Sequence, residues 1–223
     1  MTLRHKWLTI FSNDNIDADK LNTAFDVIEN CYSESHRTYH TLNHIEYMLN
    51  KIDNLLKVYL LDDASDKKAL YLATWFHDII YTTTQSSIDN ERASAEFACK
   101  MLGELGIDDS SLLYTVYHLI LCTKTHQTTS DSMVDTTLEA IMIDADLAIL
   151  GDSEVVYANY KKEIYAEWAH LPTKRFLEGR CLFLKHMLNK SDIFISEYFK
   201  ELFTEQAIAN ISQELQSIQQ PSI

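Results

Sequence analysis

The chain has 223 residues, of which 46% are hydrophobic, so it is long enough to bury a sizeable core. It contains only four glycines and two prolines, where average usage would give about 15 and 11, and this shortage of turn residues argues against a β-sandwich or β-barrel. The formal net charge of −14 argues against a nucleic-acid polymer as partner, because such binding depends on Lys and Arg. A small phosphorylated ligand remains compatible with this charge, because a bound divalent cation dominates its local field.

The sequence also bears on location in the cell. It begins with MTLRHKWLTIF, which lacks the apolar core of a signal peptide, and no apolar run approaches the roughly 18 residues of a membrane span. The four cysteines form no CxxC pair, and we interpret them as reduced thiols. We therefore expect a cytoplasmic protein with no membrane partner.

Helical periodicity is clear from residue 42 onward. Over residues 42–59 apolar side chains recur every three or four positions, which predicts one face of an α-helix. A second helix is predicted over residues 66–81, with His77 and Asp78 near its C-terminal end. A third is predicted over residues 89–105, ended by Gly106.

The second half of the sequence predicts five further helices. Four of them cover residues 110–124, 137–150, 153–169 and 173–189, and the last of these begins just after Pro172. Ser191 is a candidate N-cap for a final helix that reaches about residue 218.

We find no repeat, low-complexity segment or linker in the chain. About eight helices without such a division predict an all-α fold, a compact multi-helix bundle formed by one domain over residues 1–223. The aromatic residues near the C-terminus, Phe194, Tyr198 and Phe203, are interpreted either as core or as the surface of a homodimer.

Two histidines four positions apart, His40 and His44, are the first candidate metal-binding residues. If both are helical, they project from one face. The spacing alone is weak evidence, because the zinc-protease motif needs a Glu directly after the first His and none is present. The alternative for His44 is a histidine at the edge of a core face.

The adjacent pair His77 and Asp78 has a more informative setting. Apolar residues surround it in the segment WFHDIIY, and a charged Asp in such surroundings is costly unless it is paired or bound to a metal. The alternative is a buried hydrogen bond between the two side chains. Histidine nitrogens and carboxylate oxygens together are typical ligands of a catalytic divalent ion.

A fourth ligand is predicted in the segment IMIDADLAILG. Helix geometry favours Asp146 over Asp144, because Asp146 flanks the apolar stripe of its helix and Asp144 points further from it. Asp144 is then expected either to contact a metal ligand without binding the ion itself or to face solvent.

The order of one His, an adjacent His-Asp pair and a distant Asp resembles the signature of the HD-domain metal-dependent phosphohydrolases. The segment YHTLNHIEYM is also similar to the YHNxxHA segment of the cyclic-nucleotide phosphodiesterases, which belong to the same superfamily. The resemblance implies that His40 is the general acid and that a divalent ion (Mn, Mg, Fe, Ni, Co or Zn) binds His44, His77, Asp78 and Asp146. Asp78 could in addition orient the attacking water.

A closer resemblance, over about residues 30–215, is to a bacterial family of predicted metal-dependent HD phosphohydrolases. It rests on the segments RTYHTLNHI, FHDIIY, DNERASA, CTKTH, DADLAILG, YKKEIYAEW, EGR and ANISQEL. One position departs from the family, which usually has Arg where Tyr165 stands here.

Three residues are predicted to contact the substrate or the water at the metal. Arg37 and Lys124 are candidate phosphate contacts, and Glu91 resembles an acidic residue that follows the His-Asp helix in the family. For Arg37 the alternative is an exposed residue at a loop–helix junction. For Lys124 it is a cation at a helix C-terminus, and for Glu91 it is a carboxylate that complements a helix dipole. Arg180 is more often structural.

The sequence thus predicts a metal-dependent phosphohydrolase acting on a small phosphorylated molecule, a nucleotide or another phosphomonoester or pyrophosphate. Two alternatives stay open. One is a di-iron oxygenase of HD type, for which His118 and His126 are the spare ligands. The other is a non-catalytic binding module that retains the metal for stability.

Overall fold

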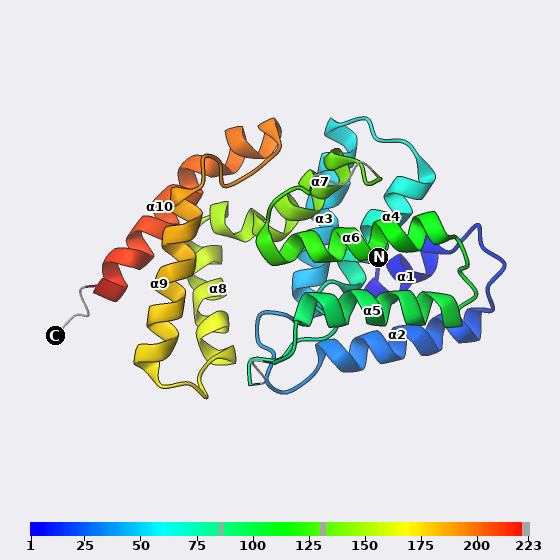
Figure 1. Ribbon diagram of the computed structural model, residues 1–223, viewed down its shortest axis with the longest axis horizontal. Coiled ribbons are helices and arrows are strands. Elements are labelled where there is room, and N and C mark those ends of the chain that lie inside the picture. The colour runs from blue at the N-terminus through cyan, green and yellow to red at the C-terminus, as the bar shows by residue number, and fades with distance from the viewer. Residues whose placement is uncertain (85–86, 130–132, 220–223) are drawn as a thin grey trace. The chain divides into compact units, whose positions relative to one another are not determined.

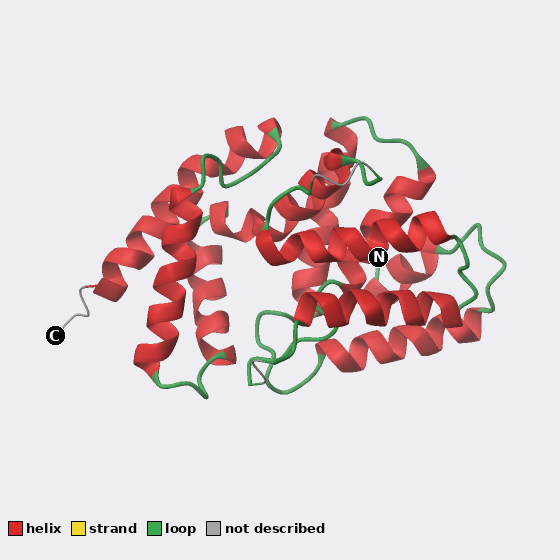
Figure 2. Cartoon of the chain, viewed as in Figure 1, coloured by secondary structure: helices red, strands yellow, loops and turns green. Residues whose placement is uncertain are grey.

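The computed structural model describes residues 1–84, 87–129 and 133–219, and this part of the chain contains helices and no strand (Figures 1 and 2). The all-α prediction is confirmed. In chain order the helices are α1 Leu3–Ile10, α2 Ala18–Tyr32, α3 Leu42–Val58, α4 Ala64–Phe76, α5 Asn90–Glu104, α6 Ser110–Thr125, α7 Thr136–Leu147, the short 3-10 helix η1 Ala148–Gly151, α8 Glu154–Glu167, α9 Thr173–Asn189 and α10 Glu197–Gln219. None of these helices is both long and apolar enough to cross a membrane.

The chain divides into two compact units, Met1–Met142 and Ile143–Ile223. The division falls inside α7, so the first unit contains α1 to α6 with the start of α7, and the second contains the end of α7 with η1 and α8 to α10. The predicted single domain stays a prediction, and each unit is described separately below.

Helix α4 forms the centre of the first unit. It contacts α3, α5 and α6, and α5 lies alongside α6 (Figure 1). Its last turns are apolar on every side, and the fully buried Trp75 packs edge-on against the rings of Trp7 and Phe25, at centroid distances of 5.9 and 5.8 Å. Aromatic pairs in this geometry contribute beyond their buried area. The end of α4 is therefore a rigid position for the residues that follow it.

In the second unit α10 packs against η1 and α9. The backbones of η1 and α10 approach so closely at Gly151 that a Cβ atom there would lie 2.6 Å from both the Cβ and the carbonyl oxygen of Phe203. The buried Asn210 side chain donates hydrogen bonds to the carbonyl oxygens of Leu150 (2.9 Å) and Asp152 (2.8 Å). These bonds satisfy carbonyls at the end of η1 and fix it on α10.

Several helix ends follow the chemistry of their capping residues. Asp63 caps α4 by accepting hydrogen bonds from the backbone N–H groups of Ser65 and Asp66. Gly106, at a φ of 93°, ends α5 as predicted, and the Ile107 N–H donates back to the Leu102 carbonyl. This is the arrangement in which a glycine in the left-handed region terminates a helix.

Other boundaries differ from those predicted. Helices α1 and α2 were not among the predicted elements, and α4 ends at Phe76 instead of residue 81. The last helix begins at Glu197, so Ser191 does not cap it. Ser196 lies directly before it, and its Oγ accepts a hydrogen bond from the Phe199 N–H at 3.2 Å. The Asp144 carboxylate adds support by accepting hydrogen bonds from the backbone N–H groups of Ile195 (2.7 Å) and Ser196 (2.8 Å).

The aromatic residues near the C-terminus divide into two kinds. Phe194 is fully buried and packs on the rings of Phe199 and Phe203, so it is a core residue of the second unit. Tyr198 is partly exposed. The predicted homodimer stays a prediction.

Candidate metal centre

The candidate metal ligands of the first unit come from the ends of two neighbouring helices. His44 lies in the first turn of α3 and is 3% exposed, and His77 is the residue that ends α4 and is 1% exposed. Asp78 follows directly. His40 precedes the N-cap of α3, which is Thr41, so the premise that His40 and His44 share one helical face is wrong. Their rings nevertheless lie close, with centroids 5.8 Å apart.

One atom from each of His44, His77 and Asp78 meets at a single point. The two Nε2 atoms are 3.2 Å apart, and Asp78 Oδ2 lies 2.9 Å from His77 Nε2 and 3.8 Å from His44 Nε2. Within the described part of the chain, this is the group of three or more His, Cys, Asp or Glu side chains whose ligand atoms converge closely enough to hold a metal ion. The structure thus brings together three of the four predicted ligands.

The dimensions of this triangle match one face of a metal's coordination sphere. A point equidistant from three atoms with these separations lies about 2.0 Å from each of them, and first-row divalent ions bind His nitrogen and carboxylate oxygen at about 2.0–2.2 Å. An ion just outside the plane of the three atoms would therefore reach all of them without movement of the backbone.

The hydrogen bonding of His77 orients it for such a role. Its Nδ1 atom lies 3.0 Å from the carbonyl oxygen of Thr74, which can only accept, so Nδ1 carries the proton of that bond. In the neutral ring, Nε2 then presents its lone pair to Asp78 Oδ2. Two lone pairs at 2.9 Å repel, so this position requires either a proton on His77 Nε2 or a cation. Metal-binding histidines typically have the same second-nitrogen bond to a carbonyl.

Asp78 is strongly favoured in its charged form. Burial alone would raise the pKa of this carboxyl, but the neighbouring His77 and His40 outweigh burial and hold the pKa well below its usual range. The carboxylate is therefore available as a ligand at neutral pH.

His40 lies beside the cluster without joining it. Its Nε2 atom is 3.9 Å from Asp78 Oδ2, and its side chain is partly exposed. The imidazole packs on the ring of Tyr81, with centroids 4.2 Å apart, and edge-on against Tyr39. Tyr81 was not among the predicted site residues, and its place three residues after Asp78 in an apolar segment was the available signal.

Arg37 is not the exposed residue that the alternative interpretation assumed. Its side chain is fully buried and makes four hydrogen bonds within the first unit. Nε donates to Glu34 Oε2 at 2.9 Å, and NH2 donates to the Ile79 carbonyl at 3.0 Å. NH1 donates to the carbonyl oxygens of Asp78 (2.6 Å) and His40 (3.3 Å). With most of its five N–H groups engaged, we place Arg37 with the residues that hold the site together, instead of the predicted phosphate contacts.

Lys124 and Glu91 lie near the N-terminus of α5. Lys124 Nζ forms an ion pair with Asp89 Oδ2 at 2.6 Å, which raises the pKa of the lysine. Glu91 is half-buried, and burial together with the nearby carboxylates of Asp89 and Asp78 raises its pKa. The predicted role of Glu91 beside the metal stays a prediction. The role of Lys124 in binding substrate stays a prediction.

The two aspartates of α7 have the reverse of the exposure expected from helix phase. Asp144 is completely buried and Asp146 is half-buried. The phase argument failed because the buried apolar residues of α7 are not confined to one stripe and include Ile141, Met142, Ile143, Ala145 and Leu147, so the apolar stripe does not tell which aspartate is buried. The carboxylate of Asp144 is used at the start of α10, whereas Asp146 belongs to the second unit and remains the predicted fourth ligand.

The other residues selected from the sequence have mostly structural surroundings. Neither His118 nor His126 belongs to the converging group. His118 packs on Tyr114, at a centroid distance of 4.2 Å, and His126 ends α6 with a positive φ. Arg180 forms a buried ion pair with Glu214. Tyr165, at the position where the resembled family has Arg, packs edge-on against Phe176. The Tyr165 side chain is exposed apart from this contact.

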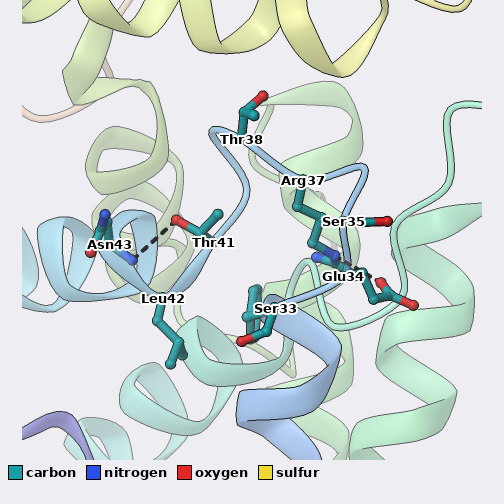
Figure 3. Close-up of a pocket in the computed structure, with 9 residues that line it drawn as sticks. Ser33, Glu34, Ser35, Arg37, Thr38, Thr41, Leu42 and Asn43 are labelled. Carbon is teal, nitrogen blue, oxygen red and sulfur yellow. Dashed lines mark hydrogen bonds and ion pairs between the residues drawn. The ribbon is translucent and has the colours of Figure 1, made fainter.

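A polar cavity of about 370 Å³ lies on the loop that carries His40. Figure 3 shows Arg37 reaching toward Glu34 along its wall, with Thr38 on the other side of the loop. Its lining runs from the end of α2 to the start of α3 and consists of Tyr32, Ser33, Glu34, Ser35, Arg37, Thr38, Thr41, Leu42 and Asn43. The volume is in the range of small-molecule sites, and the lining residues flank His40 and His44 in the sequence.

No family model, no curated protein and no solved structure matches this chain.

Proposed function

We propose that this protein is a metal-dependent phosphohydrolase of HD type that acts on a small phosphorylated substrate, a nucleotide or another phosphomonoester or pyrophosphate. The observation that carries the proposal is the convergence of His44 Nε2, His77 Nε2 and Asp78 Oδ2 on one point about 2.0 Å from each. Asp146 is proposed as the fourth ligand.

The donor set bears on the identity of the ion. Two imidazole nitrogens and one carboxylate oxygen suit Mn, Fe, Co, Ni or Zn better than Mg, which prefers oxygen alone. Three protein ligands, or four with Asp146, leave coordination positions open for water and substrate, as in catalytic sites.

In the proposed reaction, a divalent ion held here supplies a Lewis acid for a phosphoryl oxygen and lowers the pKa of a water molecule. Asp78, whose side chain is partly accessible, would accept a hydrogen bond from that water and so orient it. His40 stands beside the cluster, partly exposed, where it can give a proton to the leaving oxygen.

Metal content and phosphatase activity test the proposal together. We expect purified protein to retain close to one equivalent of a divalent ion by elemental analysis after dialysis. It should hydrolyse at least one compound in a screen of nucleotides, sugar phosphates and pyrophosphates. Asp78→Asn should lose both properties and retain its helical circular dichroism. Asp62→Asn is the matched control, because Asp62 is almost fully exposed.

The alternatives give different results in the same experiment. Full metal content in Asp78→Asn would show that the ligand assignment is wrong. One equivalent of metal without activity on any phosphate compound would favour the non-catalytic binding module. Two equivalents of iron with no phosphatase activity would favour the oxygenase.

A further inference from the structure

We propose that Arg37 is a positioning residue, whose guanidinium holds the backbone of His40 and Asp78 in place and thereby sets the geometry of the metal cluster. The proposal deepens the function proposed above and rests on it for its metal-binding test. It replaces the substrate contact that the sequence suggested for this arginine.

The bonds of Arg37 connect the two segments that carry the site. One segment is the loop between α2 and α3, which contains His40, and the other follows α4 and contains Asp78. A single guanidinium donates to the carbonyl oxygens of His40 and Asp78 through NH1 and to that of Ile79 through NH2. The Asp78 bond, at 2.6 Å, joins residues 41 positions apart in the chain.

Aromatic rings enclose the same group. The Cζ atom of Arg37 lies 5.2 Å from the ring centroid of Tyr32 and 5.4 Å from that of Tyr81, within the range of cation–π attraction. The ring of Tyr81 in turn packs on the His40 imidazole. A second bond between the segments runs from His36 Nε2 to the Tyr81 carbonyl, at 2.9 Å. Arg37 is therefore the centre of an assembly that fixes His40 from two sides.

The number and directions of the acceptors around residue 37 explain why it is an arginine. Three carbonyl oxygens and one carboxylate oxygen surround the guanidinium, and its planar fork supplies donors in several directions at once. A lysine ammonium carries the same charge with three donors on one atom, so it cannot reach all of these acceptors. Loss of the fork leaves buried carbonyls without a donor, and the segments that carry Asp78 and His40 would then separate.

Substitution of Arg37 by Lys is the direct test, with Mn²⁺ affinity as the first measurement. We expect the Mn²⁺ dissociation constant to rise about 10- to 100-fold in Arg37→Lys, which is the usual effect of removing a residue that supports a metal ligand. Arg37→Gln should show a larger loss if it folds. Arg175→Gln is the control, because Arg175 is exposed on α9, and it should bind Mn²⁺ as the wild type does.

A phosphate-contact role would give the opposite pattern. If Arg37 bound substrate, Mn²⁺ affinity would stay within about twofold of wild type in Arg37→Lys, and inorganic phosphate would bind the Mn²⁺-loaded protein much more weakly. That result would overturn the proposal.

Amide hydrogen exchange provides a measurement that does not depend on metal. In metal-free protein, Arg37→Lys should increase exchange in residues 34–41 and 77–81 and leave α9 unchanged. Unchanged exchange in both segments would overturn the positioning role. Failure of wild-type protein to bind any metal would count against the proposed function alone, because the exchange experiment would still decide the role of Arg37.

Discussion

The Nε2 atoms of His44 and His77 face each other at 3.2 Å, although 33 positions separate the two residues in the sequence. Two imidazole nitrogens at this distance share either a proton or a metal ion. Because His77 donates its Nδ1 proton to the Thr74 carbonyl, its Nε2 lone pair is directed into the cluster. Protons and a divalent ion therefore compete for the same position, and metal binding should release protons.

Substitution of His44, in α3, and of His40, in the turn before it, should distinguish metal binding from acid catalysis. His44→Gln should lose Mn²⁺ or Co²⁺, because it removes one of three converging atoms. His40→Gln should retain the metal and lower the rate by about two to four orders of magnitude, as expected for loss of a general acid. The rate loss should shrink for a nitrophenyl phosphate, whose leaving group needs little protonation.

His186→Gln is the matched control, since His186 is exposed on α9 and should affect neither property. Metal loss in His40→Gln would make His40 a ligand. An unchanged rate of His40→Gln on a substrate with a poor leaving group would show that His40 only packs against its neighbours.

The paired aspartates of α7 should separate stability from metal binding. Asp144→Asn leaves one oxygen for two backbone N–H groups at the start of α10, so it should lower the free energy of unfolding by about 1–3 kcal/mol. Burial raises the pKa of Asp144, and its backbone hydrogen bonds offset only part of that effect. Asp146→Asn should instead reduce metal content with little change in stability.

Chemical denaturation and elemental analysis of the two variants measure both effects. The assignment would be reversed if Asp144→Asn lost the metal at unchanged stability and Asp146→Asn retained it.

The fold was predictable wherever local sequence carried the signal. The 3.6-residue periodicity located α3, α5, α6 and α9 to within one or two residues, and Gly106 ended α5 as expected. The start of α10 was missed although it carries a local signal, because Ser196 accepts a hydrogen bond from the Phe199 N–H. The contact that no local pattern predicts is that of the Asp144 carboxylate, 51 residues away from Ile195. Helix phase misjudged Asp144 because buried residues occur around most of α7, so the apolar stripe does not mark the buried side.

The site was predictable in part for the same reason. His44, His77 and Asp78 carry their chemistry in their side chains, and motif order selected all three. Arg37 was selected for its charge, but its observed hydrogen bonds run to backbone carbonyls distant in the chain, which no residue type identifies. Whether the three atoms hold an ion, with Asp146 as fourth ligand, stays a prediction.

Two glycines in the second unit should respond oppositely to alanine. At Gly151 a Cβ would lie 2.6 Å from the backbone of Phe203, so Gly151→Ala should destabilise the protein by at least about 1–3 kcal/mol. Gly179 lies inside α9, and a Cβ added there would have no neighbouring atom within 4 Å, so Gly179→Ala should stabilise by about 0.5–1 kcal/mol. Thermal or denaturant unfolding measures both. A stable Gly151→Ala variant would show that η1 and α10 can separate at little cost.

The buried ion pair between Arg180 and Glu214 should be the most sensitive polar contact of the second unit. Arg180 donates from Nε to Glu214 Oε1 (2.9 Å) and from NH2 to Oε2 (3.1 Å), while the Tyr157 hydroxyl donates to Oε2 at 2.5 Å. Glu214→Gln would turn an amide donor toward these donors and leave the guanidinium charge buried without a carboxylate. We expect a loss of about 3–5 kcal/mol in the free energy of unfolding. Glu205→Gln, the same change at an exposed position of α10, should stay within about 0.5 kcal/mol of wild type. Equal stability of the two variants would show that Arg180 finds other acceptors, and that this pair does not hold α9 to α10.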